Sequence, residues 1–371
     1  MSRNVSPFKP RILVAPLDWG LGHATRCIPV IRELLNNDCE VFLAGEGKIK
    51  SLLQAEFPEQ VFLKLKGYNI NYGKTGWELF GKLLLQIPKI IEVMDQEHEW
   101  LHNMIEEHQI GAVISDNRYG LFNEKIHSVF ITHQLLIKTS LGNTADRLLQ
   151  KLNYEYVNAF NECWVPDVAG ADNLSGDLSH PAIMPKIPVL YLGTLSRFEE
   201  KNLSEKEEHL LVMLSGPEPQ RTILEELLLE QLKQYKQPVC FVRGLPGNTD
   251  LPVVPENITL ENHLPTAALQ KAISKASFVI SRCGYSTIMD LMLLKKKSIL
   301  IPTPAQTEQE YLAEHLMKNN LALCLPQSKF KLLNALELAA SFNYQLQNFK
   351  TSEALKDVVH VLIEKLRKEK E

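Results

Sequence analysis

The stretch "RILVAPLDWGLGHATR" (residues 11–26) joins a short apolar run to two glycines, a histidine and an arginine. Residues 12–17 are continuously apolar, which is typical of a strand covered on both faces of a parallel sheet. The segment that follows, 24–37, carries apolar residues at helical spacing. The stretch therefore predicts a strand, a tight glycine turn and a helix, the first unit of an alternating α/β fold.

The same alternation of apolar runs and helical patterns fills the rest of the chain, and it restarts once. Strands of the first set are expected at 39–45, 61–66, 111–116 and 128–134. Strands of the second set are expected at 210–216, 238–244, 258–264, 277–284 and 297–304. We therefore expect two Rossmann-like, doubly wound parallel-sheet domains that face a cleft, with ligands at the carboxyl ends of the strands.

The charged segment 195–209 separates the two sets and is the expected linker. The first domain would then cover 1–194, and the second, which would bind the nucleotide-sugar donor, 210–351. The last segment, 352–371, has the pattern of an amphipathic helix with a basic end.

The composition narrows the class of protein. The 371 residues are 45% hydrophobic and 23% charged, with a formal net charge of −4, which argues against a nucleic-acid-binding protein. The six cysteines are scattered without zinc-site spacing, and no apolar run reaches the roughly 18–20 residues of a membrane span. We expect a cytoplasmic protein with neither a bound metal nor a cofactor.

The glycine turn of the opening stretch holds the first candidate catalytic residue. Gly20 and Gly22 let the backbone turn and let a ligand approach it. Thr25 stands where a dinucleotide fingerprint has its third glycine, so that motif is incomplete. His23 follows at the start of a helix, where it could act as a general base or simply fill the turn.

The stretch "RCGYST" (282–287) is the most specific signal in the chain. The free N–H groups of a helix beginning near Ser286, with Arg282 beside them, suit a diphosphate. Asp290, one turn later, could accept hydrogen bonds from a ribose. "AQTEQE" (305–310) follows the next strand and could hold sugar hydroxyls, although it is also an ordinary helix start.

Two further polar loops follow expected strands. "LSGPEPQR" (214–221) suits a phosphate contact that includes Arg221, and "ISDNRYG" (114–120) suits an acceptor site or an Asx turn. Asp116 in the latter is a second candidate base. The candidate acceptor-binding residues are Asp18, Asn117, Arg118 and His133.

Residues 64–91 combine basic and aromatic side chains. We expect either a patch that touches the cytoplasmic face of the inner membrane or a core helix with solvated lysines. The side chains concerned are Lys64, Lys66, Lys74, Lys82, Lys89, Tyr68, Tyr72, Trp77 and Phe80.

These motifs together resemble the GT-B glycosyltransferases, in particular the branch of the GlcNAc transferase that makes peptidoglycan lipid II, whose C-terminal domain is of the family 28 type. The resemblance implies two facing Rossmann-like domains with a C-terminal helix that crosses back to the first. It also implies a UDP-sugar donor and a glycan or lipid-linked acceptor of the cell envelope. The sequence has no D-x-D motif, so we expect a metal-independent, inverting hexosyl- or N-acetylhexosaminyltransferase.

The resemblance assigns roles only to residues that match the family's motifs. Gly22 and His23 match its glycine-rich loop, and "RCGYSTIMD" (282–290) matches its donor motif with Asp290 in place of a glutamate. Gln309 and Glu310 match its paired glutamines, where the second position departs. The donor-binding residues implied are Gly22, Ser215, Gly216, Arg221, His263, Leu264, Arg282, Gly284, Ser286, Thr287, Asp290, Gln309 and Glu310.

"GLGHATRC" (20–27) is also similar to the UDP-sugar hydrolases of pseudaminic acid synthesis. In such an enzyme the histidine would direct water at the anomeric carbon, whereas in a transferase it would deprotonate a sugar hydroxyl. A sugar-nucleotide sensor or membrane scaffold without catalysis is a third hypothesis.

Overall fold

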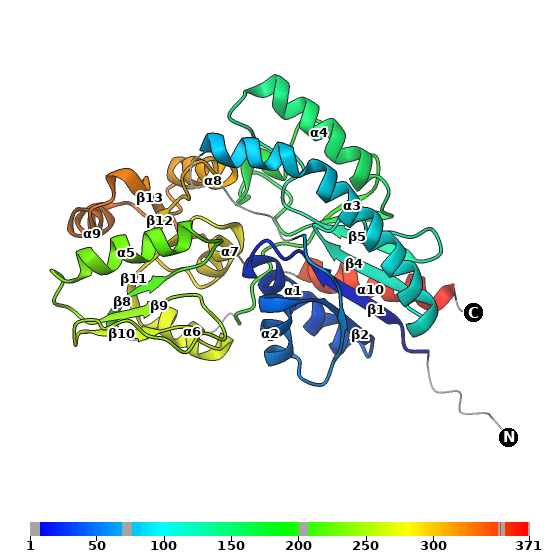
Figure 1. Ribbon diagram of the computed structural model, residues 1–371, viewed down its shortest axis with the longest axis horizontal. Helices are drawn as coiled ribbons and strands as arrows, with labels where there is room; N and C mark the ends of the chain where they lie inside the picture. Colours follow the sequence, from blue (N-terminus) through cyan, green and yellow to red (C-terminus); the bar gives the residue numbers. More distant parts are fainter. Residues whose placement is uncertain (1–7, 69–75, 200–206, 348, 350–352, 370–371) are drawn as a thin grey trace.

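The computed structural model describes residues 8–68, 76–199, 207–347, 349 and 353–369, and for 76–87 it gives the course of the helix only. Two α/β domains lie next to each other, each built on one parallel sheet (Figure 1). The predicted fold class is thus confirmed.

The first sheet has seven strands in the order β3-β2-β1-β4-β5-β6-β7, all parallel. Its strands are β1 (Arg11–Pro16), β2 (Glu40–Gly45), β3 (Val61–Lys64), β4 (Ala112–Asp116), β5 (His127–Ile131), β6 (Glu162–Val165) and β7 (Val189–Tyr191). Its helices are α1 (Leu21–Asn36), α2 (Gly47–Glu56), α3 (Gly76–His108) and α4 (Asn143–Val157).

The second sheet has six strands in the order β10-β9-β8-β11-β12-β13, again all parallel. Its strands are β8 (His209–Met213), β9 (Val239–Val242), β10 (Ile258–Glu261), β11 (Ala276–Arg282), β12 (Ser298–Ile301) and β13 (Leu323–Cys324). Its helices are α5 (Gln220–Leu232), α6 (Thr266–Ser274), α7 (Tyr285–Leu293), α8 (Thr307–Lys318) and α9 (Leu332–Ser341).

The strand order decides where ligands can bind. In the first sheet, β1 to β3 follow one another towards one edge, and β4 to β7 follow one another towards the other, so the strand order reverses between β1 and β4. In the second sheet the strand order reverses in the same way between β8 and β11. Such switch points open a crevice at the carboxyl ends of the strands. His23 lies in the first turn of α1 just after β1, Asp116 is the last residue of β4, and Ser215 and Gly284 follow β8 and β11. Both switch points thus coincide with predicted site residues.

Helices α1 and α7 pack against each other across the boundary between the domains (Figure 1). Ile28 and Ile31 of α1 are buried in the same apolar cluster as Ile288 and Met292 of α7. One continuous core thus passes from one domain to the other, and burying these side chains together opposes separation of the domains.

The last helix, α10 (Glu353–Lys368), returns to the first domain, as expected. It packs against α1 (Figure 1), and Lys365 forms an ion pair with Glu162 of β6 at 3.2 Å. In the part of the chain that the structure describes, no helix is both long and apolar enough to span a membrane.

Candidate active site

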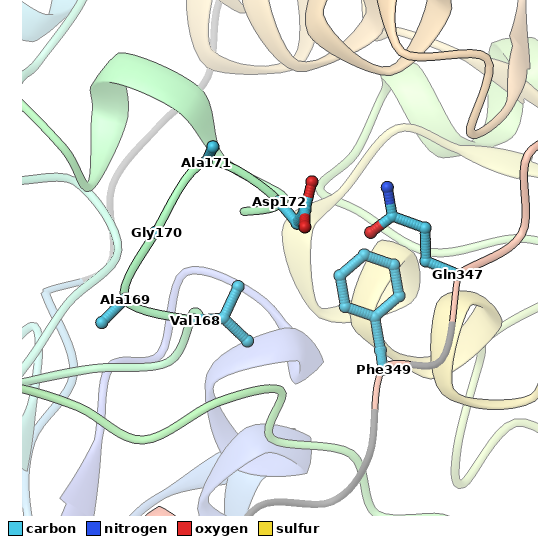
Figure 2. Close-up of a pocket in the computed structure, with 7 residues that line it drawn as sticks. All are labelled: Val168, Ala169, Gly170, Ala171, Asp172, Gln347 and Phe349. Carbon is cyan, nitrogen blue, oxygen red and sulfur yellow. The ribbon is translucent and has the colours of Figure 1, made fainter.

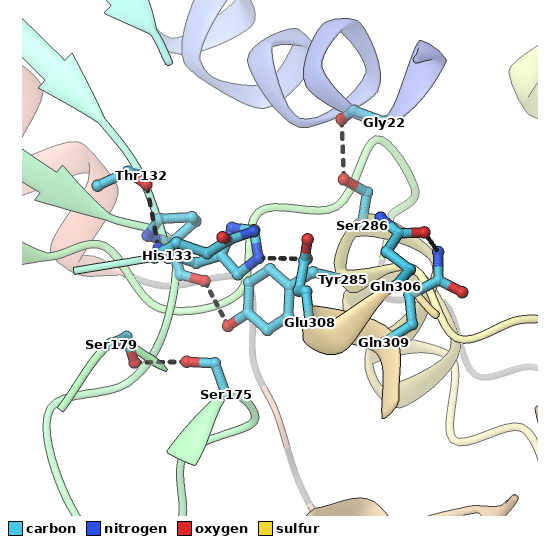
Figure 3. Close-up of polar contacts among 12 residues, drawn as sticks. Gly22, Thr132, His133, Ser175, Ser179, Tyr285, Ser286, Gln306, Glu308 and Gln309 are labelled. Carbon is cyan, nitrogen blue, oxygen red and sulfur yellow. Dashed lines mark hydrogen bonds and ion pairs between the residues drawn. The ribbon is translucent and has the colours of Figure 1, made fainter. Parts of the chain in front are cut away.

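The glycine turn brings the first domain against the donor motif of the second. Helix α1 begins at Leu21, three residues earlier than expected, so Gly22 and His23 lie in its first turn. The Ser286 hydroxyl of α7 donates a hydrogen bond to the Gly22 carbonyl oxygen at 2.8 Å (Figure 3). A Cβ at Gly22 would lie 3.0 Å from the Ser286 hydroxyl oxygen, so this close approach favours glycine.

His23 and Asp116 form a pair at the switch point of the first sheet. The His23 Nδ1 atom lies 2.7 Å from Asp116 Oδ1, and Asp116 is completely buried at the end of β4. Arg26 Nη2 is also 3.0 Å from Nδ1, but the carboxylate oxygen is nearer and negatively charged. We therefore place the Nδ1 proton towards Asp116, which leaves Nε2 of His23 to accept a proton.

Arg26 keeps the Asp116 carboxylate ionised. Burial raises the pKa of Asp116, but the charges and hydrogen bonds of Arg26 and His23 outweigh burial and lower that pKa to about 2. A carboxylate with so low a pKa and no exposure is a poor base. We therefore correct the prediction that Asp116 is a second candidate base. Asp116 is placed to orient His23 and not to take a proton itself.

The polar cluster continues across the domain interface. Arg26 Nη1 lies 3.1 Å from His133 Nδ1, and His133 Nε2 lies 2.8 Å from the Glu308 carboxylate of α8 (Figure 3). The Tyr285 ring of α7 stacks on the His133 ring, with 4.1 Å between centroids and 7° between planes. Arg26 and Glu308 were not predicted as site residues from the sequence.

Arg282 is a buried cation in the second domain. Its guanidinium donates hydrogen bonds to the carbonyl oxygens of Gln220 at 2.7 Å and of Ile301 and Pro302 at 3.4 Å. Burial lowers its pKa to about 10, and none of the described carboxylates forms an ion pair with it. A buried charge without a counterion is compatible with an anionic ligand, and the diphosphate contact of Arg282 stays a prediction.

Gly284, Ser286 and Thr287 lie at the start of α7. This helix start follows Arg282, the last residue of β11, along the chain. Gly284 is the N-cap residue, and no described side chain caps the helix start. The first N–H groups of α7 therefore remain available to an acceptor.

Arg221 differs from Arg282 because its charge is already matched. Its guanidinium lies 2.6 Å from Glu218 and also pairs with Glu225. Ser215 and Gly216 follow β8 at the same edge of the sheet, as expected. We correct the expected phosphate contact of Arg221, since these two carboxylates already bind its charge.

Asp290 lies in α7 against the segment that was expected to be the linker. The Ser196 hydroxyl donates a hydrogen bond to it at 2.5 Å, and Arg197 Nε lies 3.7 Å away. Burial raises the pKa of Asp290 to about 6 although Arg197 opposes this. Burial and then Arg197 lower the pKa of His263, which follows β10 together with Leu264.

Arg197 was missed in the sequence because it stands among charged residues typical of a linker. Its Nε atom is buried without a hydrogen-bond partner among the described residues. Only the arrangement of β7, α7 and the loop after β10 brings Arg197 near Asp290 and His263.

The first turn of α8 is arranged differently from the expectation. Gln309 accepts a hydrogen bond from the Thr303 N–H at 2.8 Å, and Glu310 accepts one from the Ala305 N–H at 3.0 Å. Both side chains therefore hold the loop before α8. Glu308, the residue before Gln309, instead reaches the first domain, where its carboxylate contacts His133.

Two of the predicted acceptor-binding residues have structural roles instead. Arg118 is completely buried, pairs with Glu97 of α3 at 2.7 Å and donates to the Lys66 carbonyl oxygen at 2.5 Å. Asp18 accepts a hydrogen bond from the Tyr68 N–H at 3.1 Å. The expected acceptor contacts of Arg118 and Asp18 are thus corrected, because both residues fasten the segment before residue 69.

Asn117 and His133 have different positions. Asn117 adopts a left-handed backbone conformation, with φ of 56°, and its N–H donates to the Ile131 carbonyl oxygen at 3.2 Å. That conformation favours the Asx-turn alternative at this loop. His133 is the one predicted acceptor-binding residue whose side chain reaches the second domain.

The basic and aromatic patch at 64–91 lies partly outside the described residues. Tyr72 and Lys74 are not described, nor are the side chains of Trp77, Phe80 and Lys82. Tyr68, one of the side chains of the expected patch, is buried and donates a hydrogen bond to Glu97 at 2.8 Å. Lys64, Lys66 and Lys89 are exposed.

A cavity of about 660 Å³ lies between the loop 168–172 and the segment that leads to α10 (Figure 2). Val168, Asp172, Gln347 and Phe349 line it, and none of the predicted site residues does. Within the described ranges, no three His, Cys, Asp or Glu side chains are placed to hold a metal ion.

Comparisons with known proteins agree with the architecture. Residues 253–364 match the glycosyltransferase family 28 C-terminal domain, and the match includes the donor motif. A comparison with the sequences of curated proteins finds no match.

Solved structures of glycosyltransferases share the two-domain fold over nearly the whole chain. The glycotransferase of kitacinnamycin has 15% identity and a TM-score of 0.63, with 98% of this chain and 96% of that one covered. SnogD from Streptomyces nogalater has 12% identity and a TM-score of 0.61, with 97% and 100% covered. MurG of Acinetobacter baumannii has 16% identity and a TM-score of 0.55, with 96% and 100% covered. At these identities the likeness shows the GT-B fold alone.

Proposed function

We propose that the protein is a glycosyltransferase that moves a sugar from a nucleotide sugar to an acceptor hydroxyl, with His23 as the general base. The observation that carries this proposal is the His23–Asp116 pair, which lies at the switch point of one sheet directly opposite the donor motif of the other. The family 28 match of the second domain supports a nucleotide-sugar donor. The resemblance of the motifs favours UDP as its nucleotide.

The proposed reaction moves one proton and exchanges one bond. The acceptor hydroxyl gives its proton to Nε2 of His23, and its oxygen attacks the anomeric carbon of the sugar. The bond from that carbon to the diphosphate breaks, and the nucleoside diphosphate leaves with the electron pair. Asp116 stabilises the imidazolium that forms, because its carboxylate stays ionised beside Nδ1. Attack opposite the leaving group inverts the anomeric centre.

The charge that develops on the leaving diphosphate requires positive partners. We assign this role to Arg282 and the first N–H groups of α7, which lie together at the end of β11. Asp290 and Arg197 would hold the nucleoside, because a buried carboxylate and a partly buried guanidinium lie 3.7 Å apart there.

Donor entry requires the domains to separate. The Ser286 hydroxyl and the Gly22 carbonyl oxygen are 2.8 Å apart, which leaves no room for a phosphate between them. We propose that the domains 1–194 and 210–351 move apart to admit the donor and then close over it. Closure would then exclude water from the reaction.

The acceptor is the least defined partner. We propose a glycan or lipid-linked acceptor, following the resemblance, and peripheral membrane contact through the exposed lysines of 64–91. Binding of the wild-type protein to vesicles of anionic phospholipid tests the membrane contact, and no binding at low salt would contradict it.

Replacing Arg282 by methionine is expected to weaken nucleoside diphosphate binding by about tenfold to a hundredfold, because one charge-assisted contact is lost. Isothermal titration calorimetry with UDP, GDP, ADP and dTDP measures this loss and identifies the preferred base. Lys297→Met is the matched control, since Lys297 is exposed and directly precedes β12. Its charge thus lies at the amino end of β12, whereas Arg282 pairs with the carboxyl end of that strand. Equal affinities of the wild type and Arg282→Met would contradict the assigned role.

Donor affinity is expected to fall as pH decreases below about 6. Burial raises the pKa of Asp290 to about 6, so the carboxyl is increasingly protonated below that value. A protonated carboxyl accepts ribose hydrogen bonds poorly, and the dissociation constant should approach a tenfold rise per pH unit. Calorimetry with a UDP-sugar at several pH values checks this. Asp290→Asn should bind weakly at every pH, and a persisting pH dependence in that variant would overturn the assignment.

A further inference from the structure

Glu56, the last residue of α2, extends from the first domain to the second, where α2 and α6 face each other (Figure 1). Its Oε1 atom accepts a hydrogen bond from the hydroxyl of Thr266, the first residue of α6. Its Oε2 atom lies 3.2 Å from Nη2 of Arg32 on α1. The Glu56 side chain is 19% exposed, so water reaches this contact only in part. A carboxylate of the first domain thus holds the start of a helix of the second.

Arg32 makes another contact from the first domain to the same region. Its Nη1 atom donates a hydrogen bond to the carbonyl oxygen of Arg197 at 2.8 Å. Gln270 of α6 binds the backbone nearby, since its Nε2 donates to the Glu199 carbonyl oxygen at 2.7 Å and its Oε1 accepts from the Glu199 N–H at 3.3 Å. The segment around Arg197 is therefore joined to α6, and Arg32 and Glu56 hold this joined unit at two points.

The two segments that are held border the proposed nucleoside site. Arg197 Nε lies 3.7 Å from the Asp290 carboxylate. His263 stands three residues before Thr266, at the end of β10. Burial lowers the pKa of His263 most, Arg197 lowers it further, and Glu56 raises it, so both charges act at this loop. Glu56 therefore acts at the nucleoside end of the donor site.

We propose that Glu56 is a positioning residue for donor binding: with Arg32 it holds α6 and the segment around Arg197 in the arrangement that receives the nucleoside when the domains close. These contacts are lost when the domains separate, so a donor bound to the second domain alone meets a less ordered nucleoside site. A nucleoside that orders the same segments favours closure in return, because coupling between two equilibria is reciprocal. The proposal rests on the nucleotide-sugar donor of the proposed function, but not on the transfer step.

Glu56→Ala is expected to weaken UDP binding by about threefold to tenfold, because one partly exposed, charge-assisted contact is lost. The KM for the donor should rise similarly, while kcat at saturating donor should change by less than about twofold, since none of the described contacts of Glu56 involves His23. Glu56→Gln keeps an oxygen that accepts the Thr266 proton and should retain most of the affinity. Glu59→Ala, three residues further on and exposed, is the matched control. Unchanged affinity in Glu56→Ala, with or without a lower kcat, would overturn the proposal.

A double-mutant cycle separates positioning from direct contact with the nucleoside. Thr266→Val removes the hydroxyl and keeps the branched shape of the side chain. If Glu56 acts through Thr266, then Glu56→Ala combined with Thr266→Val should bind UDP no more weakly than Glu56→Ala alone. Multiplied losses would mean that the two side chains act independently, and the positioning role would be refuted. Circular dichroism and thermal unfolding of each variant exclude loss of the fold as the cause.

Domain closure gives a readout that does not depend on activity. Small-angle X-ray scattering of the full chain should show that UDP makes the wild type and Glu59→Ala more compact, and that Glu56→Ala needs a higher UDP concentration for the same change. An equal response in Glu56→Ala, or no response in the wild type, would overturn the proposal. If Glu56→Ala responds less while the wild type transfers no sugar, the positioning role is supported and the proposed transfer fails instead.

Discussion

His23→Ala should reduce the rate of sugar transfer by about 10²- to 10⁴-fold, which is the usual contribution of a general base. Nucleoside diphosphate affinity should change by less than about twofold, because the diphosphate partners, Arg282 and the start of α7, belong to the other domain. Steady-state kinetics measure the first effect and calorimetry the second. The two effects should separate because His23 lies in the first domain, next to Gly22, whose carbonyl oxygen accepts a hydrogen bond from Ser286 of the donor motif.

His360→Ala provides the control for this variant, since His360 is an exposed histidine on α10. It should behave as the wild type in both measurements. Unchanged turnover in His23→Ala would refute its role as the base. Loss of nucleotide binding in that variant would instead place His23 in the donor site.

Arg118→Met should destabilise the first domain by about 3–5 kcal/mol, because it leaves the Glu97 carboxylate buried without its charged partner. Arg118 is 0% exposed and Glu97 1%, so water cannot replace the lost contact. For a domain of this size the expected fall in the unfolding midpoint is on the order of 10 °C. Differential scanning calorimetry measures it.

Lys125→Met is the matched control for Arg118, since it removes an exposed positive charge seven residues further on. It should leave the unfolding midpoint nearly unchanged. A normal midpoint for Arg118→Met together with a raised acceptor KM would support the acceptor-binding role that the sequence suggested. The structure predicts the opposite pattern.

The sequence was sufficient to locate the edges of the sheets where the site lies. Apolar runs that end in polar residues predict parallel strands, and in such sheets the polar residues must gather at one edge. His23, Asp116, Arg282 and Asp290 could be selected on that basis. The strands β6, β7 and β13 were not predicted, although other strands of four residues were.

The partners of these residues could not be predicted from the sequence. Glu308 stands beside Gln309 and Glu310, and only the rotation of α8 decides which of the three faces the first domain. Arg197 lies among charged residues, where nothing distinguishes a buried cation from a solvated one. Contacts between domains depend on how the two units pack, and no local pattern encodes that packing.

The burial of Arg118 shows the same limit within one domain. "SDNRYG" (115–120) has the polar character of a binding loop, yet Arg118 turns inward to Glu97 on a helix that precedes it in the chain. Burying an arginine is favourable only with such a partner, and the partner is 21 residues away. A charged residue at a strand end is therefore a candidate binding residue, and its structural neighbours decide whether it is one.

The most direct test of the central claim follows release of nucleoside diphosphate from UDP-sugars by the wild type, with and without a membrane and glycan extract as acceptor source. The proposed function predicts release that depends on the extract, transfer of labelled sugar into it, and loss of both in His23→Ala. Equal release without any acceptor would contradict transfer and would indicate hydrolysis. No release from any nucleotide sugar, in the presence of every acceptor source, would contradict the account as a whole.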